Sequence, residues 1–167
     1  MLVEMRVSGL AVDPFTNTPV VILKDIAGRN GLPIWIGMCE AGAIATELEK
    51  IELARPMTHD LIKNILGQLS VEVVRVEVND LRDSTYYATI VLRRDGHELD
   101  VDARPSDALA LALRTGASVW VEEAILEKAR QIDLRGRSEE AGAEVDEERY
   151  REFLVGISDE PAAKWKM

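Results

Sequence analysis

The chain has 167 residues, the size of one ordinary domain, and 47% of them are hydrophobic, which is enough to form a core. No apolar run approaches the ~20 residues that a membrane-spanning helix needs, so we expect no membrane association. The single cysteine, Cys39, excludes an internal disulfide and a thiolate metal cluster. The first residues lack a basic segment followed by an apolar one, so we expect no signal peptide and a cytoplasmic location.

Acidic residues are spread along the whole chain, whose formal net charge is −10. Residues 136–160 hold 9 acidic and 3 basic residues, a net charge of −6, and residues 1–135 hold 21 and 15, which is also −6. Proteins draw most of their affinity for nucleic acid from basic residues that neutralise phosphates. Any contact with nucleic acid must therefore use a local basic patch, or metal ions that bridge carboxylates to phosphate.

The first third of the chain predicts three strands followed by a helix. Apolar residues alternate over Val3–Val12, with a change of phase near Ser8–Gly9 that indicates a β-bulge. Turns rich in proline, asparagine and glycine separate this strand from two more, Val20–Leu23 and Leu32–Ile36. A helix is predicted over Cys39–Leu53.

A second helix follows a proline. Arg55–Pro56 predicts the end of the first helix, since proline disfavours helical geometry in the residue before it. Thr58 is the expected N-cap of the second helix, and Asp60 is favourable in its first turn. Five residues at helical spacing give this helix an apolar face: Leu61, Ile62, Ile65, Leu66 and Leu69.

The pattern then restarts. Three strands, a helix, a short strand and a last helix are predicted, at Val71–Val78, Tyr86–Leu92, Leu99–Ala103, Ser106–Thr115, Ser118–Val121 and Glu122–Ile132. When the chain is laid over itself at a spacing of 67 residues, Glu40 falls on Asp107 and Glu47 falls on Arg114. The sequence therefore predicts an internal duplication, with generic strand-then-helix periodicity as the alternative.

These elements predict an α+β fold built from a duplicated β-β-β-α unit, with mixed sheets, packed helices and a short C-terminal helix. The predicted domain covers residues 1–133. An acidic linker without a sustained apolar face is expected over residues 134–148. A short amphipathic helix is expected over residues 149–157, and a flexible tail over residues 158–167.

Two short motifs carry polar residues at predicted helix starts. In the first, Ser106 is the expected N-cap, and Asp107 lies where negative charge meets the helix dipole, with Arg114 two turns further on. In the second, His59 stands beside Asp60 and has the chemistry of a general base. Both motifs also fit a purely structural interpretation, as capped helices with surface side chains.

The first helix carries two carboxylates, Glu40 and Glu47, seven residues apart. At 1.5 Å per residue they lie about 10 Å apart along the axis, too far to share one metal ion directly. The chain has no Gly-rich phosphate loop and no nucleophile elbow, and its two histidines and one cysteine disfavour a tetrahedral zinc site. Its oxygen ligands suit magnesium or manganese, and no organic cofactor is expected.

Three segments together resemble the bifunctional nuclease family in order and spacing. They are Leu32-Pro33-Ile34-Trp35-Ile36-Gly37 followed by Glu40-Ala41, then Arg55-Pro56 with Thr58-His59-Asp60, then Arg104-Pro105-Ser106-Asp107-Ala108 with Ala110-Leu111-Ala112-Leu113-Arg114. The resemblance spans Leu2 to Ile132. It implies an α+β fold with internal duplication, oligomers, and activity on both DNA and RNA. The additional C-terminal domain that recruits nucleotide-excision partners in some members is not expected here.

The resemblance implies a set of motif positions. We assign roles to these positions from the chemistry of their side chains. Glu40 and Asp107 are expected to hold a divalent ion, His59 to activate water, and Arg104 and Arg114 to contact phosphate. The full set of expected positions is His59, Asp60, Asp107 and Glu40 as catalytic, Arg104, Ser106, Arg114 and Arg55 as substrate-binding, and Glu40 and Asp107 as metal ligands. Glu47 belongs to the same motifs without an assigned role.

Two other functions stay open. A non-enzymatic oligomeric regulator or scaffold explains the net charge better, and Arg104–Asp107 and Arg114–Glu47 would then be structural ion pairs. An enzyme acting on small phosphorylated metabolites would need only a small basic pocket. Apolar strand edges and the C-terminal helix predict a homo-oligomer in each case, with a dimer favoured over a monomer.

Overall fold

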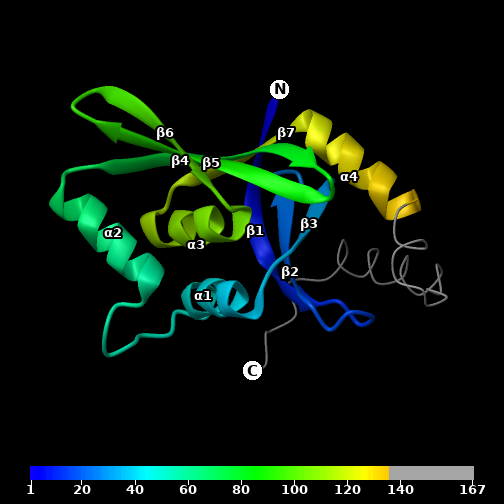
Figure 1. Ribbon diagram of the computed structural model, residues 1–167, viewed down its shortest axis with the longest axis horizontal. Coiled ribbons are helices and arrows are strands. Elements are labelled where there is room, and N and C mark those ends of the chain that lie inside the picture. The colour runs from blue at the N-terminus through cyan, green and yellow to red at the C-terminus, as the bar shows by residue number, and fades with distance from the viewer. Residues whose placement is uncertain (136–167) are drawn as a thin grey trace.

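A computed structural model describes residues 1–135 of the chain, with side chains described to residue 129. One sheet of seven strands carries four helices (Figure 1). In chain order the elements are β1 (Leu2–Val12), β2 (Pro19–Asp25), β3 (Gly31–Trp35), α1 (Met38–Leu48), α2 (Thr58–Gln68), β4 (Glu72–Arg82), β5 (Thr85–Arg94), β6 (His97–Ala103), α3 (Pro105–Thr115), β7 (Ser118–Glu122) and α4 (Glu123–Arg135). The predicted α+β class is confirmed.

The strands lie in the order β3-β2-β1-β7-β4-β5-β6. Each antiparallel meander of three strands is followed by a helix, so the order β-β-β-α occurs twice along the chain. β7 joins the two meanders, since it pairs antiparallel with β1 and parallel with β4. The sheet is therefore mixed. The bulge predicted near Ser8–Gly9 is confirmed by a register shift between Val7 and Gly9.

The two helices that follow the meanders have the same length and the same offset. α1 and α3 are 11 residues each, and their bounds differ by 67 residues, from Met38 to Pro105 and from Leu48 to Thr115. Glu40 and Asp107 are each the third residue of their helix, so the spacing found in the sequence holds in three dimensions. That the repeat arose by internal duplication remains a prediction.

Two predicted helix ends are wrong. α1 ends at Leu48 rather than Leu53, because Lys50 adopts a left-handed φ of 51° and the Ile51 N–H bonds back to the Thr46 carbonyl. α4 runs to Arg135, so it enters the stretch predicted as linker. The rest of that linker, the helix over residues 149–157 and the tail over residues 158–167 lie outside the described residues.

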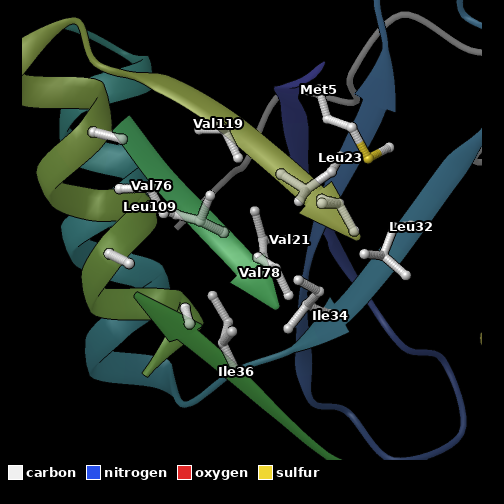
Figure 2. Packing of buried hydrophobic residues seen from close by; sticks show 14 of the residues in the cluster. Met5, Val21, Leu23, Leu32, Ile34, Ile36, Val76, Val78, Leu109 and Val119 are labelled. Atoms are coloured by element: carbon white, nitrogen blue, oxygen red, sulfur yellow. The ribbon is translucent and has the colours of Figure 1, made fainter. Parts of the chain in front are cut away.

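The core lies between the sheet and α1, α3 and α4. Side chains from both meanders, from β7 and from α3 meet there, as Figure 2 shows for Val21, Val78, Leu109 and Val119. α3 is buried along most of its length and contacts both α1 and α2. α2 and α4 lie toward opposite ends of the molecule's long axis (Figure 1). This packing brings the starts of α1, α2 and α3 toward one another.

Candidate functional site

Acidic and basic side chains at the starts of three helices bond to one another. Arg104, the N-cap of α3, donates from Nη1 to Glu40 Oε1 in the first turn of α1, at 2.7 Å. Its Nε donates to Asp107 Oδ2 in the first turn of α3, also at 2.7 Å. The other oxygen of Asp107 lies 2.9 Å from His59 Nε2, at the start of α2. We refer to Glu40, His59, Arg104 and Asp107 as the Arg104 cluster.

Within the Arg104 cluster, the arginine is open to solvent and the histidine is enclosed. The Arg104 side chain is 65% exposed, and the His59 side chain is 11% exposed. Burial alone would raise the pKa of Asp107, but hydrogen bonds from Arg104 and His59 outweigh it and hold that pKa below its ordinary value. An ionised carboxylate only accepts, so Nε2 of His59 carries the hydrogen. Nδ1 of the neutral ring is then the nitrogen that accepts a proton.

The absence of a side chain at Gly37 leaves space for the Glu40 carboxylate. A Cβ at Gly37 would overlap with Glu40 Oε2, so the glutamate side chain folds back over the start of its own helix. At the offset of 67 residues, the position of Gly37 corresponds to that of Arg104. Gly37, the N-cap of α1, therefore leaves room for the Glu40 carboxylate, which bonds Arg104, the N-cap of α3. Gly37 lies in the first of the three segments that resemble the family, but the sequence did not indicate that it makes room for Glu40.

A second charged group joins the same three helices in the interior. Arg114 donates from Nε to Asp60 Oδ1 at 2.7 Å, and its two terminal nitrogens donate to the carbonyls of Ala43 and Ala110, each at 2.9 Å. The Arg114 side chain is only 3% exposed. Asp60 also accepts from the Met57 N–H, and this bond and the Arg114 bond hold the pKa of Asp60 below its ordinary value. We refer to Arg114, Asp60 and the two carbonyls as the Arg114 anchor.

The structure therefore divides the predicted site residues between two places. One place is the Arg104 cluster, whose four residues were all predicted. The predicted Arg104–Asp107 ion pair is confirmed there. Asp60 and Arg114 form the separate anchor, so the Arg114–Glu47 pair is wrong, and Glu47 bonds Lys50 instead. Asp60 is turned toward Arg114, and His59 toward Asp107, so the two neighbours do not bond each other.

Two other predicted positions belong to neither group. Arg55 is exposed between α1 and α2, and Ser106 is buried in the first turn of α3. The N-cap roles of Ser106 and Thr58 are wrong, because the caps are Arg104 and Met57. Pro105 takes the first helical position of α3, where its missing N–H costs nothing, and this moves Ser106 inside the helix.

The Arg104 cluster does not fit a divalent ion between Glu40 and Asp107. One guanidinium bonds both carboxylates and takes the place between them that a cation would need. Among the side chains that the structure describes, those of residues 1–129, no three of His, Cys, Asp or Glu are arranged to hold a metal ion. The magnesium or manganese site stays a prediction, and a titration with each metal would test it.

The fold and its polar cluster define a mixed α+β domain with an acid–base–arginine group at a junction of helix starts. None of the helices in the described part has the length and apolar character to cross a bilayer. The family described as the bifunctional nuclease domain matches residues 21–133, which include all four residues of the Arg104 cluster. The chain belongs to this family.

Two curated proteins of Mycobacterium tuberculosis, uncharacterized proteins MT1877 and Rv1829, are similar to this chain over nearly its whole length. Each is 41% identical to it over 158 residues, which cover 93% of this chain and 94% of the relative. The similarity therefore extends on both sides of the segment that the family matches.

Proposed function

We propose that the protein cleaves phosphodiester bonds of DNA and RNA at the Arg104 cluster. Its membership of the bifunctional nuclease domain family supports a nuclease-related function. The observation that carries the proposal to this site is the bond between His59 and Asp107, which also bonds the exposed Arg104. A base, the acid that orients it and a phosphate-binding cation are the parts that hydrolysis of a phosphate diester needs.

In the proposed reaction, Asp107 orients His59 through Nε2, and Nδ1 takes a proton from the attacking water. The new bond forms between that oxygen and phosphorus, the bond to the leaving ester oxygen breaks, and the leaving oxygen takes a proton from solvent water. Arg104 neutralises charge on the phosphate oxygens as it develops, because a guanidinium pairs with phosphate in a bidentate way. To do so Arg104 exchanges at least part of its bonding to Glu40 for the phosphate.

The net charge of the chain affects how tightly it can bind nucleic acid. Residues 1–135 carry a net charge of −6, so acidic side chains outnumber the basic ones that could neutralise phosphate, and Arg104 is one of the exposed basic ones. We expect weak binding with a shallow dependence on salt, since each phosphate contact adds to the salt dependence. Cys39 is free and exposed, which suits the reducing cytoplasm in which we place this activity.

Cleavage of labelled single-stranded RNA and DNA tests the proposal. The protein is purified free of host nuclease and assayed with EDTA, magnesium or manganese. We expect His59→Ala to slow cleavage by about 100-fold, the lower end of what a general base contributes. His97→Ala is the matched control, because His97 is exposed at the start of β6, and we expect it to cleave normally. Equal rates for the two variants, with both folded by circular dichroism, would rule out the assignment.

A specific observation also favours the non-enzymatic scaffold. Arg104 is already paired with two carboxylates, and Arg114 is enclosed and paired with Asp60, as expected of structural ion pairs. In that case purified protein would cut neither polymer under any metal condition, and His59→Ala would lower stability only. The same assay therefore separates the two functions.

A further inference from the structure

The two edge strands of the sheet differ in exposure. β3, at one edge, has three buried residues, and one of them is Pro33, which has no N–H to offer a further strand. β6, at the other edge, contains no proline, and its residues from His97 to Asp102 are all exposed. An open edge strand presents unpaired main-chain groups and is a template for another strand. Within the described residues, β6 is therefore the edge at which the sheet can be extended.

The turn before β6 determines which of its main-chain groups are unpaired. Asp95 and Gly96 form a two-residue loop with φ values of 50° and 80°, as in a type I′ turn, and this loop joins Arg94 to its strand partner His97. The turn closes with a main-chain hydrogen bond between these two partners. Bonded and non-bonded pairs then alternate along an antiparallel ladder. From His97 onward, every second residue of β6 therefore bonds β5, and the residues between direct their N–H and C=O groups away from the sheet.

The residues with outward main-chain groups are all acidic: Glu98, Asp100 and Asp102. Their side chains lie on one face of the sheet, because alternate residues of a strand share a face. Arg75 and Arg93 bond Glu98 at 3.2 and 3.0 Å. Asp100 and Asp102 are exposed, and neither forms an ion pair with a side chain that the structure describes. Two carboxylates without a cationic partner in the described part of the chain therefore lie beside unpaired main-chain groups.

The opposite face of the same strand is apolar. Leu99 and Val101 alternate with the acids, and their side chains are 54% and 42% exposed. Their strand partners in β5, Leu92 and Ile90, are half-buried beside them. A strand laid along β6 would cover these apolar side chains as well as pair the main chain. We refer to Glu98–Asp102 as the β6 edge.

Charge selects what can pair with the β6 edge. A second copy of β6 would place acids opposite acids, and like charges directly opposite in a sheet are destabilising. Nucleic acid, which is itself negative, would meet the same repulsion. In an added strand, basic side chains at every second position would lie directly opposite the acids, and opposite charges so placed stabilise the pairing. The residues between them would face Leu99 and Val101, so they should be apolar.

We propose that the β6 edge binds an extended segment of a partner protein in which basic and apolar residues alternate. The segment adds to the seven-stranded sheet next to β6, antiparallel to it. Main-chain hydrogen bonds supply affinity in this mode of binding, and the side chains at alternate positions supply specificity. The β6 edge shares no residue with the Arg104 cluster, so this inference does not rest on the proposed cleavage of DNA and RNA.

A synthetic peptide, Lys-Val-Lys-Val-Lys-Val-Lys with blocked termini, tests the proposal by calorimetric titration of the full chain. We expect it to bind, and Asp100→Asn with Asp102→Asn to weaken binding roughly 10-fold, because two cross-strand charge pairs are lost. Glu49→Gln with Glu52→Gln is the matched control, since it removes two exposed carboxylates outside β6, and it should bind normally. A peptide of the same composition with its lysines in one block should bind more weakly. No binding at millimolar peptide, or equal affinities for the two peptides or for the two variants, would overturn the proposal.

Amide exchange measured by NMR shows where the peptide lies and needs no variant. The N–H groups of Glu98, Asp100 and Asp102 should exchange quickly in the free protein and slowly in the complex. Those of Leu99 and Val101 should be protected in both, because they bond β5. Protection of the three acidic residues without peptide would mean that another part of the chain covers the edge, or a second copy where protection rises with protein concentration. Either result, or protection by the peptide at a different place, would make the proposal wrong.

Discussion

The Arg114 anchor and the Arg104 cluster use the same chemistry in opposite environments. In each, an arginine of α3 bonds a carboxylate of another helix at 2.7 Å. The Arg114 side chain is 3% exposed, and its two terminal nitrogens donate to two carbonyls, so burial closes it to a ligand. Arg104 is 65% exposed and bonds only carboxylates. Burial, rather than residue type, separates the arginine that holds the helices from the arginine able to change partners.

The largest expected effect is on stability at the Arg114 anchor. Arg114→Ala removes the donor to Asp60 Oδ1 and to two interior carbonyls, and we expect the free energy of unfolding to fall by roughly 3 kcal/mol. Arg104→Ala is the matched control, and its loss should be much smaller because its exposed ion pairs are screened by water. Urea unfolding followed by circular dichroism measures both. Equal losses would remove the distinction between the two groups.

The second expected effect is on catalysis, and it reverses the order of the two arginines. Arg104→Ala should lower kcat/KM for oligonucleotide cleavage by roughly 10- to 100-fold, or about 1.4–2.7 kcal/mol, because it removes the cation beside His59. Arg104→Lys should recover part of the rate, since a lysine supplies charge without the bidentate geometry. Activity unchanged in both variants would make Arg104 a structural residue.

A third, smaller effect is expected from a substitution that breaks the bond between Glu40 and Arg104 and leaves both residues in the chain. Gly37→Ala places a Cβ where the Glu40 carboxylate lies, so the flexible side chain must move away from Arg104. We expect KM for oligonucleotides to fall several-fold, because Arg104 loses one of the carboxylates that compete with phosphate. Gly42→Ala is the control inside the same helix, where an added Cβ meets nothing within 4 Å. It should leave KM unchanged and stabilise the protein by roughly 0.5–1 kcal/mol.

The smallest effect is a change in how stability responds to acid. The folded-state pKa of Asp60 is lowered from 3.8, first by the Met57 N–H and then by Arg114. A lowered folded pKa gives stability that is complete above pH 3.8 and is lost as the pH falls through the folded value. Asp60→Asn does not titrate, so its stability should depend less on pH below this point. Identical pH profiles for the two proteins would show that Asp60 contributes nothing to acid stability.

The parts of the fold that depend on local pattern were predictable from the sequence. Alternation located the strands, and Gly116 marked the end of α3, where it adopts a left-handed φ of 72°. The end of α1 was not predictable, because Lys50 takes a left-handed conformation where glycine or asparagine would be expected. Proline at position 56 lies too far beyond that end to signal it.

The candidate site was predictable as a set of residues but not as two groups. Motif spacing brought out Glu40, His59, Arg104 and Asp107, yet His59 and Asp107 are 48 residues apart and meet only because α2 crosses α3. The choice of Asp60 over Glu47 as the partner of Arg114 depends on the same crossing. The orientation of α2 was also not predictable. An apolar face at helical spacing normally predicts the buried side of a helix, whereas the apolar side of α2 is exposed.

The central place of β7 has a consequence for synthesis on the ribosome. β1, β2 and β3 can form their meander early, but the other edge of β1 waits for a strand that begins at Ser118. β4 waits for the same strand on its own free edge. Until residue 122 has left the ribosome, the nascent chain therefore exposes two unpaired strand edges, which are templates for aggregation. We expect yields at high expression to depend on chaperones that shield these edges.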